Sequence, residues 1–210
     1  MSRFVMRCVR FSMVAAVTFS SHWASAQGYG GYPAWDGYPD GTPGMALMEQ
    51  GSPAVMLRDG VERLTRFLQR RPSQRALAAY LEKEVAPWFD FDYMAEWAAG
   101  RHLRQLDEDQ FDDLSMRLKQ SFLEKMTQKL VGYSQQRASF LPPRALGNDQ
   151  ITLPVLIEHP GNGYPARLEF QMRKTDQGWK VVDVSANGMS ALVFYRQMFD
   201  DMVRQAPNMR

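Results

Sequence analysis

The sequence has 210 residues, 45% of them hydrophobic, which is enough for one domain of ordinary size with its own core. Its formal charge of +2 includes Arg3, Arg7 and Arg10, which lie in a segment typical of a signal peptide; taking these three from the 25 basic residues leaves 22 against 23 acidic residues, net −1. A nearly neutral protein lacks the basic surface that nucleic acids require, and the lone Cys8, in the same segment, leaves no thiol for a disulfide, a thiolate zinc site or a nucleophile.

Residues 1–26 have the pattern of a secretory signal peptide. The three arginines come first, an apolar run from Phe11 to Phe19 follows, and Ala24-Ser25-Ala26 supplies the small residues of a cleavage site. The apolar run is shorter than the roughly 20 residues that a membrane span needs. We therefore expect cleavage after Ala26 and an exported, soluble product; an uncleaved anchor is the alternative.

Residues 27–51 are rich in glycine, proline and aromatic residues and show neither a helical nor an alternating period. Such a segment buries too little surface to offset its chain entropy, so it is expected to be a disordered linker. The alternative is an adhesive recognition tail built on Tyr32, Trp35 and Tyr38.

Helical signals dominate the first half of the remaining chain, residues 52–206. Ser52 and Pro53 are an N-cap and a first-turn proline for a helix that runs to about Arg70. A second helix is expected from Pro72 to Pro87. Further helices are predicted after Asp90 or Asp92, ending at Gly100, and from Asp107 to about Tyr133.

Alternation of apolar and polar residues replaces the helical period after Tyr133. Four strands are predicted: 137–141, 151–157, a third centred on Leu168, Phe170 and Met172, and 179–184. Pro154 suggests a bulge or an edge position in the second strand. A Pro160–Gly163 turn separates the second and third strands, and a final helix begins near Met189. Helices, an antiparallel meander and a closing helix make an α+β fold.

Catalytic signals are weak. The two histidines beyond the signal peptide, His102 and His159, are not spaced as metal ligands, and the sequence contains no recognisable nucleophile, phosphate-binding or dinucleotide motif. Asp183 is the best candidate for an acid or base; the alternative, which we favour, is an outward polar residue or a partner for Arg196. We expect no catalytic residue, no metal ligand and no cofactor.

Three motifs resemble the MlaC/Ttg2D family, the periplasmic phospholipid-binding component of an ABC-type lipid transport system linked to toluene tolerance. VAPWFDFDYMA at 85–95, followed by Gly100-Arg101, matches the first motif of that family. The long helix with its leucine and aromatic spacing comes next, and GWKVVDV at 178–184 with YRQMF at 195–199 matches the last motif.

The resemblance implies helices packed on a curved four-stranded antiparallel sheet, with a C-terminal helix, that enclose an apolar lipid pocket. It also implies a periplasmic carrier, not an enzyme, which binds phospholipid and works between an inner-membrane ABC transporter complex and an outer-membrane lipoprotein complex, to maintain outer-membrane lipid asymmetry. Alternatives are a hopanoid-associated carrier of the same family and a small enzyme of similar fold. For each expected lipid contact, a purely structural place in the core is the alternative. The expected lipid-binding residues are Phe91, Met94, Leu153, Val155, Leu168, Phe170, Met172, Val182, Val184, Met189, Leu192 and Tyr195.

Overall fold

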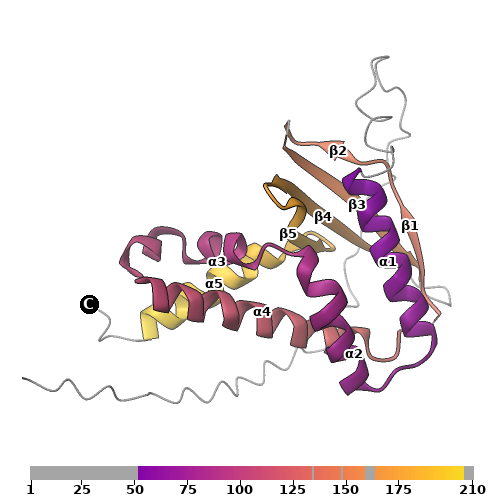
Figure 1. Cartoon of the computed structure of the whole chain (residues 1–210), viewed down its shortest axis with the longest axis horizontal. Coiled ribbons are helices and arrows are strands. Elements are labelled where there is room, and N and C mark those ends of the chain that lie inside the picture. Colours follow the sequence, from indigo (N-terminus) through magenta and orange to yellow (C-terminus); the bar gives the residue numbers. More distant parts are fainter. Residues whose placement is uncertain (1–51, 134, 148, 159–163, 206–210) are drawn as a thin grey trace, which may run out of the picture. The chain divides into compact units, whose positions relative to one another are not determined.

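Helices begin and end the folded chain, and an antiparallel sheet lies between them (Figure 1). The computed structural model describes residues 52–133, 135–147, 149–158 and 164–205, all within the compact unit Gly41–Arg210. The predicted signal peptide, the linker, His159 and the Pro160–Gly163 turn lie outside these residues. In the described part, no helix combines the length and the apolar character that a membrane span requires.

The first helix, α1 (Pro53–Gln69), begins as predicted. The Ser52 hydroxyl accepts a hydrogen bond from the Val55 N–H, at 3.3 Å, and Pro53 occupies the first turn. The next, α2 (Gln74–Tyr80), is capped by Ser73 and continues into a π-helical turn, η2 (Leu81–Val85), and a 3-10 turn, η3 (Ala86–Trp88).

The α-helical part of the second predicted helix therefore ends earlier than expected, at Tyr80. Pro87 has no N–H to donate, and its ring would collide with the carbonyl four residues earlier in a regular α-helix. The wider π-helical turn lies directly before the proline, where a regular α-helix cannot continue.

Aspartates cap the next two helices. The Asp90 carboxylate accepts from the Tyr93 N–H, at 3.0 Å, at the start of α3 (Phe91–Ala99), whereas Asp92 accepts from the Ser115 hydroxyl at 2.6 Å. A 3-10 turn, η4 (Gly100–Gln105), follows α3. Asp107 forms a capping box with Gln110 at the start of α4 (Glu108–Leu130).

The sheet has six strands, not four. The predicted four are β1 (Arg137–Phe140), β3 (Gln150–Glu158), β4 (Ala166–Thr175) and β5 (Gly178–Ala186), and the two additions are the dipeptides β2 (Arg144–Ala145) and β6 (Met189–Ser190). The strands are antiparallel and pair in the order β1-β3-β4-β5-β6, with β2 also on β3. Two-residue strands are too short to show an alternating pattern in a sequence.

Pro154 does not mark an edge or a bulge, because β3 is an inner strand and its pairing with β4 runs through Pro154 without a break. The other neighbour of β3 is interrupted instead. Pairing with β1 ends at Val155, pairing with β2 begins at Thr152, and the Pro154 carbonyl accepts from the Leu141 N–H at 3.0 Å. The missing N–H of the proline therefore faces the gap between two short strands.

A β-bulge interrupts β5. Gln171 of β4 is opposite Asp183, but the next residue, Met172, is opposite Val181, so Val182 has no partner in the register. Bulges of this kind bend a strand and increase its twist, in agreement with the predicted curvature of the sheet.

The last helix, α5 (Ala191–Gln205), begins two residues later than predicted, because Met189 and Ser190 form β6. Asp183 is buried, with 4% of its surface exposed, and its carboxylate accepts from the Ser190 hydroxyl at 2.6 Å and the Leu192 N–H at 3.1 Å. The expectation of an outward residue or a partner for Arg196 is therefore wrong: Asp183 joins β5 to the start of α5.

Arg196 lies at the opposite joint of α5. Its guanidinium donates to the Trp97 carbonyl, near the C-terminus of α3, and stacks 3.7 Å above the Trp97 ring. Gly100, with φ +52°, allows this approach, since a Cβ there would come within 3.0 Å of the guanidinium. A cation at a helix C-terminus is also favourable for the helix dipole.

The helices pack in two places (Figure 1). α3 packs against α4 and α5, and α3 and α5 also contact β5, while α1 contacts β1 at the far side of the sheet. Gly60 brings α1 against η3, since a Cβ there would lie only 2.4 Å from the Trp88 ring. One continuous core joins buried side chains from α1 (Leu57), α3 (Met94) and the sheet (Leu153).

Replacing Asp183 with alanine should lower the stability, because the Ser190 hydroxyl and the Leu192 N–H lose a buried acceptor. We expect a loss of about 2 kcal/mol, or a melting temperature lower by about 4–8 °C. Ser185→Ala, in the same strand, is the control and should change stability by less than about 0.5 kcal/mol. Equal melting temperatures for the two variants would contradict the capping role of Asp183.

Replacing Gly100 with alanine should cost about 1–3 kcal/mol, because the alanine must adopt φ +52° and displace the Arg196 guanidinium. Gly132→Ala is the control, since Gly132 also has positive φ (+88°) but nothing lies within 4 Å of a Cβ there. Urea denaturation should show the larger loss for Gly100→Ala; equal losses would mean that the Arg196 contact adds nothing.

Candidate functional site

One face of the sheet is apolar over most of its length. The register places Leu153 opposite Phe170, which is opposite Val184, and Val155 opposite Leu168, which is opposite Ala186. At the two edges, Phe140 is opposite Val155 and Met189 is opposite Ala186. Residues directly opposite in an antiparallel pair share a face. We call this set the apolar face: Ala138, Phe140, Ile151, Leu153, Val155, Ile157, Leu168, Phe170, Met172, Val181, Val184, Ala186 and Met189.

The apolar face is covered at one end and open at the other. Ile151, Met172 and Val181 are at most 2% exposed. Towards the turn between β5 and β6, Leu168 and Val184 are only half-buried, and Met189 is 57% exposed. A soluble protein that leaves a contiguous apolar surface partly uncovered commonly uses it to bind a ligand or a partner.

The opposite face of the sheet is polar and internally paired. Arg167 forms an ion pair with Glu169 at 2.7 Å, and Arg173 pairs with Asp90, the N-cap of α3, at 3.0 Å. Arg173 also stacks 4.2 Å above the Tyr93 ring. The Arg173 contacts tie the polar face to α3, and the apolar face is the candidate surface for a ligand.

The structure places the predicted lipid-binding residues in two groups. Seven lie on the apolar face, of which Leu168, Phe170, Val184 and Met189 are partly or largely exposed while Leu153, Val155 and Met172 are buried. Four others, Phe91 and Met94 on α3 and Leu192 and Tyr195 on α5, are buried in the hydrophobic core. Val182 is buried in the bulge, without a place in the register. Contact between these residues and a lipid stays a prediction.

Sequence reasoning left two buried residues of the apolar face out of the predicted set, Ile151 and Val181. The alternation through Ile151, Leu153 and Val155 carries a signal for Ile151. No such signal exists for Val181, because the bulge breaks the two-residue period in β5.

Tyr195 places a polar atom inside the helical core. The residue is 2% exposed, and its hydroxyl makes no hydrogen bond to another described residue. Burial raises the pKa of Tyr195 to about 12, and the nearby Ser121 hydroxyl on α4 lowers that pKa by a smaller amount. The phenol therefore stays neutral at physiological pH.

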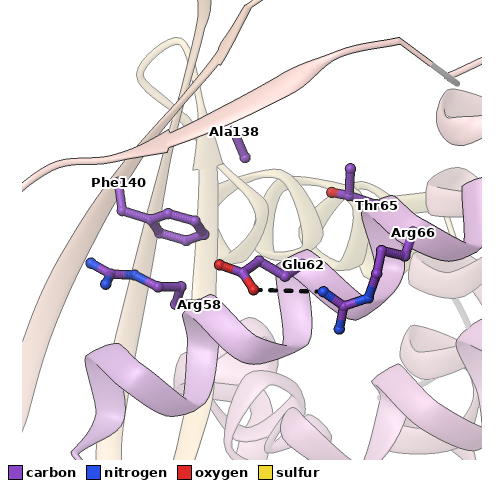
Figure 2. Close-up of a pocket in the computed structure, with 6 residues that line it drawn as sticks. All are labelled: Arg58, Glu62, Thr65, Arg66, Ala138 and Phe140. Atoms are coloured by element: carbon purple, nitrogen blue, oxygen red, sulfur yellow. Dashed lines mark ion pairs between the residues drawn. The ribbon is translucent and has the colours of Figure 1, made fainter. Parts of the chain in front are cut away.

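A separate groove lies between α1 and β1 (Figure 2). We call it the α1–β1 groove; its volume is about 480 Å³, within the range of small-molecule sites, about 300–1,000 Å³. Figure 2 shows Ala138 and Phe140 pointing from the strand towards α1, with Arg58 beside the Phe140 ring and Arg66 turned towards Glu62. The lining residues are Arg58, Glu62, Thr65, Arg66, Ala138 and Phe140.

Catalytic chemistry has little support in the described part of the chain. No three His, Cys, Asp or Glu residues there could hold a metal ion together. His102 lies beside Asp200, with 3.5 Å between nitrogen and oxygen, in a partly exposed pair between η4 and α5. Asp183, the best candidate base, already accepts from a helix N–H and a serine.

Tyr195→Phe should make the protein less sensitive to alkaline pH. The unfolded chain releases the tyrosine proton near pH 10 and the native protein only near 12, so the wild-type free energy of unfolding falls as the pH rises through this window. At pH 11 this loss amounts to about 1.4 kcal/mol. The variant lacks this titrating hydroxyl. Urea denaturation should therefore show a smaller fall in the free energy of unfolding between pH 7 and pH 11 for the variant than for the wild type. Tyr164→Phe, at a residue 97% exposed, is the control; identical pH slopes for all three proteins would contradict the buried phenol.

Residues 59–209 match the MlaC protein family. A relative from Haemophilus influenzae, the intermembrane phospholipid transport system binding protein MlaC, is 24% identical over 149 residues, which cover 67% of this chain and 70% of that protein.

A solved structure has the same fold: the phospholipid-binding protein from Ralstonia solanacearum in complex with a phospholipid. Its TM-score is 0.66 at 18% identity, and the match covers 74% of this chain and 89% of that one. The predicted α+β architecture is thereby confirmed, with six strands in place of four. Because the family match extends over most of the sequence, the chain belongs to the MlaC protein family.

Proposed function

We propose that this protein is a lipid carrier that holds acyl chains against the open end of the apolar face. The observation that supports this most is the burial gradient, from Met172, which has no exposed surface, to Met189, which is 57% exposed. An acyl chain laid on Leu168, Val184 and Met189 removes apolar surface from water on both partners. Each buried methylene contributes about 0.8 kcal/mol, so an acyl chain needs no catalytic or metal group to be retained.

The names of the similar proteins support the phospholipid as the ligand class. The Haemophilus influenzae relative is named for intermembrane phospholipid transport, and the Ralstonia solanacearum structure contains a phospholipid. In our proposal the protein is exported by residues 1–26, cleaved after Ala26, and works in the periplasm, with residues 27–51 as a linker to the lipid-binding domain at 52–206. It receives and delivers phospholipid between an inner-membrane ABC transporter complex and an outer-membrane lipoprotein complex, which maintains the lipid asymmetry of the outer membrane.

An enzymatic function has no comparable support. The similar proteins are named for binding and transport, and Asp183 has a capping role that uses both carboxylate oxygens. A hopanoid carrier remains the second candidate, since the apolar face recognises apolar surface and not a particular head group.

Native mass spectrometry of the purified protein, followed by lipid extraction, tests the carrier function directly. We expect a co-purifying lipid with phospholipid mass, released on denaturation. A polycyclic hopanoid would select the second candidate, and a protein that neither retains lipid nor takes it up from vesicles would contradict both.

Val184→Gln should weaken lipid binding, because an amide at the open end of the apolar face loses its water when an acyl chain covers it. The expected loss is about 5- to 150-fold in affinity, corresponding to about 1–3 kcal/mol for burying an unpaired amide. Ser185→Gln is the matched control: Ser185 is the next residue, is also half-buried, and lies on the polar face. Lipid retention, measured by native mass spectrometry, should fall for Val184→Gln alone; equal retention would place the lipid elsewhere.

A further inference from the structure

The floor of the α1–β1 groove is continuous with the apolar face. Phe140 is directly opposite Val155 in the register, and Ala138 is directly opposite Ile157. Val155 in turn is opposite Leu168, at the open end where we place the acyl chain. The groove and the open end of the apolar face are therefore joined across two neighbouring strands by apolar side chains, with Val155, which has no exposed surface, packed between them.

The wall of the groove is cationic. Arg58 and Arg66 both line it, and Glu62 is the one carboxylate among the lining residues. Glu62 pairs with Arg66 at 3.7 Å, in an exposed contact that neutralises one of the two guanidinium groups (Figure 2). Thr65 adds no donor, because its hydroxyl donates to the Val61 carbonyl at 2.8 Å.

Arg58 is the guanidinium that an added anion would meet. No ion pair to Arg58 forms within the described residues; its charge lies 5.4 Å above the centre of the Phe140 ring, and the residue is half-buried. A guanidinium beside an aromatic ring that forms no ion pair keeps N–H groups for an acceptor, and its planar fork suits the oxygens of a phosphate. An apolar floor and an unpaired guanidinium on the wall together suit an amphipathic anion.

We infer that the α1–β1 groove binds the phosphate group of the carried lipid, with Arg58 as the main contact and Phe140 beneath it. The inference rests on the proposed carrier function and adds a head-group site to it. The lipid then lies with its acyl chains on Leu168 and Val184 and its phosphate beside α1. The same groove chemistry suits a free phosphate ion, so the test must separate the two sources.

The test compares two lipids with identical acyl chains, phosphatidylglycerol and diacylglycerol, which differ in the phosphoglycerol head group. Delipidated protein is loaded from an equimolar mixture in detergent, and native mass spectrometry gives the ratio of the two bound species. The wild type should prefer phosphatidylglycerol, and Arg58→Gln should reduce this preference about 5- to 10-fold, with a smaller effect at high salt, since the groove is open to solvent.

Two variants act as controls. Arg63→Gln removes the same charge from the same helix, but Arg63 stacks on Trp88 and does not line the groove, so the preference should stay at the wild-type value. Arg58→Lys keeps the charge without the planar fork and should retain part of the preference. Thermal unfolding shows whether each variant is folded.

The outcomes separate this inference from the proposed function. If Arg58→Gln binds lipid with the wild-type preference, the head-group site is wrong while the carrier function stands. If the wild type takes up neither lipid, both fail. Titration calorimetry with sodium phosphate and no lipid is the last arm: Arg58-dependent binding of inorganic phosphate would overturn the assignment to a lipid head group, and its absence supports it.

Discussion

An antiparallel sheet with one apolar face is stable in water only if other parts of the chain, or a ligand, cover that face. In this fold the helices cover one end of the apolar face and leave the other end partly exposed. At the end of Ile151, Met172 and Val181, the helices and the sheet close into one core. At the end of Leu168, Val184 and Met189, the same face continues with side chains of the same kind but without full cover. In a protein with no function at this face, such residues would gain little over polar ones, whereas a binding protein needs them apolar and accessible.

The polar contacts show which helices hold their places against the sheet. Asp183 caps α5, Asp90 caps α3 and pairs with Arg173 of β4, and Arg196 joins α5 to the last turn of α3. These contacts are directional and lie around β5, so they fix α3 and α5 there. α1 is attached differently, by apolar side chains and by the close approach of Gly60 to Trp88, without a comparable ion pair to the sheet in the described residues.

Much of the fold could be predicted from local chemistry. Ser52 was recognisable as a cap, and the cap of α3 was narrowed to Asp90 or Asp92, because a short polar side chain before an apolar helical stripe has few other uses; the alternation in β3 and β4 predicted their shared face. The errors arose where tertiary contacts decided. Asp183 looked like an outward residue because the sequence does not show that the fold places the Ser190 hydroxyl and the Leu192 N–H beside its carboxylate. Pro154 looked like an edge residue because no pattern in the sequence shows a gap in the neighbouring strand.

For the candidate site, periodicity identified most of the apolar face, but it could not separate covered from uncovered positions, since both call for the same residue types. The α1–β1 groove was not predicted at all, because Arg58 and Phe140 are far apart in the sequence and each has an ordinary surface pattern.

The bulge at Val182 shifts the alternation of side chains along β5 by one residue. Before it, Val181 points to the apolar face, and after it, Val184 does so, three residues later instead of two or four. If these same residues alternated without a bulge, the side chain of Asp183 would turn into the apolar layer and that of Val184 towards the paired charges of Arg167 and Glu169. The unpaired Val182 thus sets the face of the residues that follow it: Val184 shares the apolar face with Val181, and the helix-capping carboxylate of Asp183 points to the other face. Deleting Val182 would restore a regular alternation that keeps Val181 and Val184 on the apolar face and Asp183 on the other, so the extra residue changes the bend of the strand while the polar and apolar positions stay on their own sides.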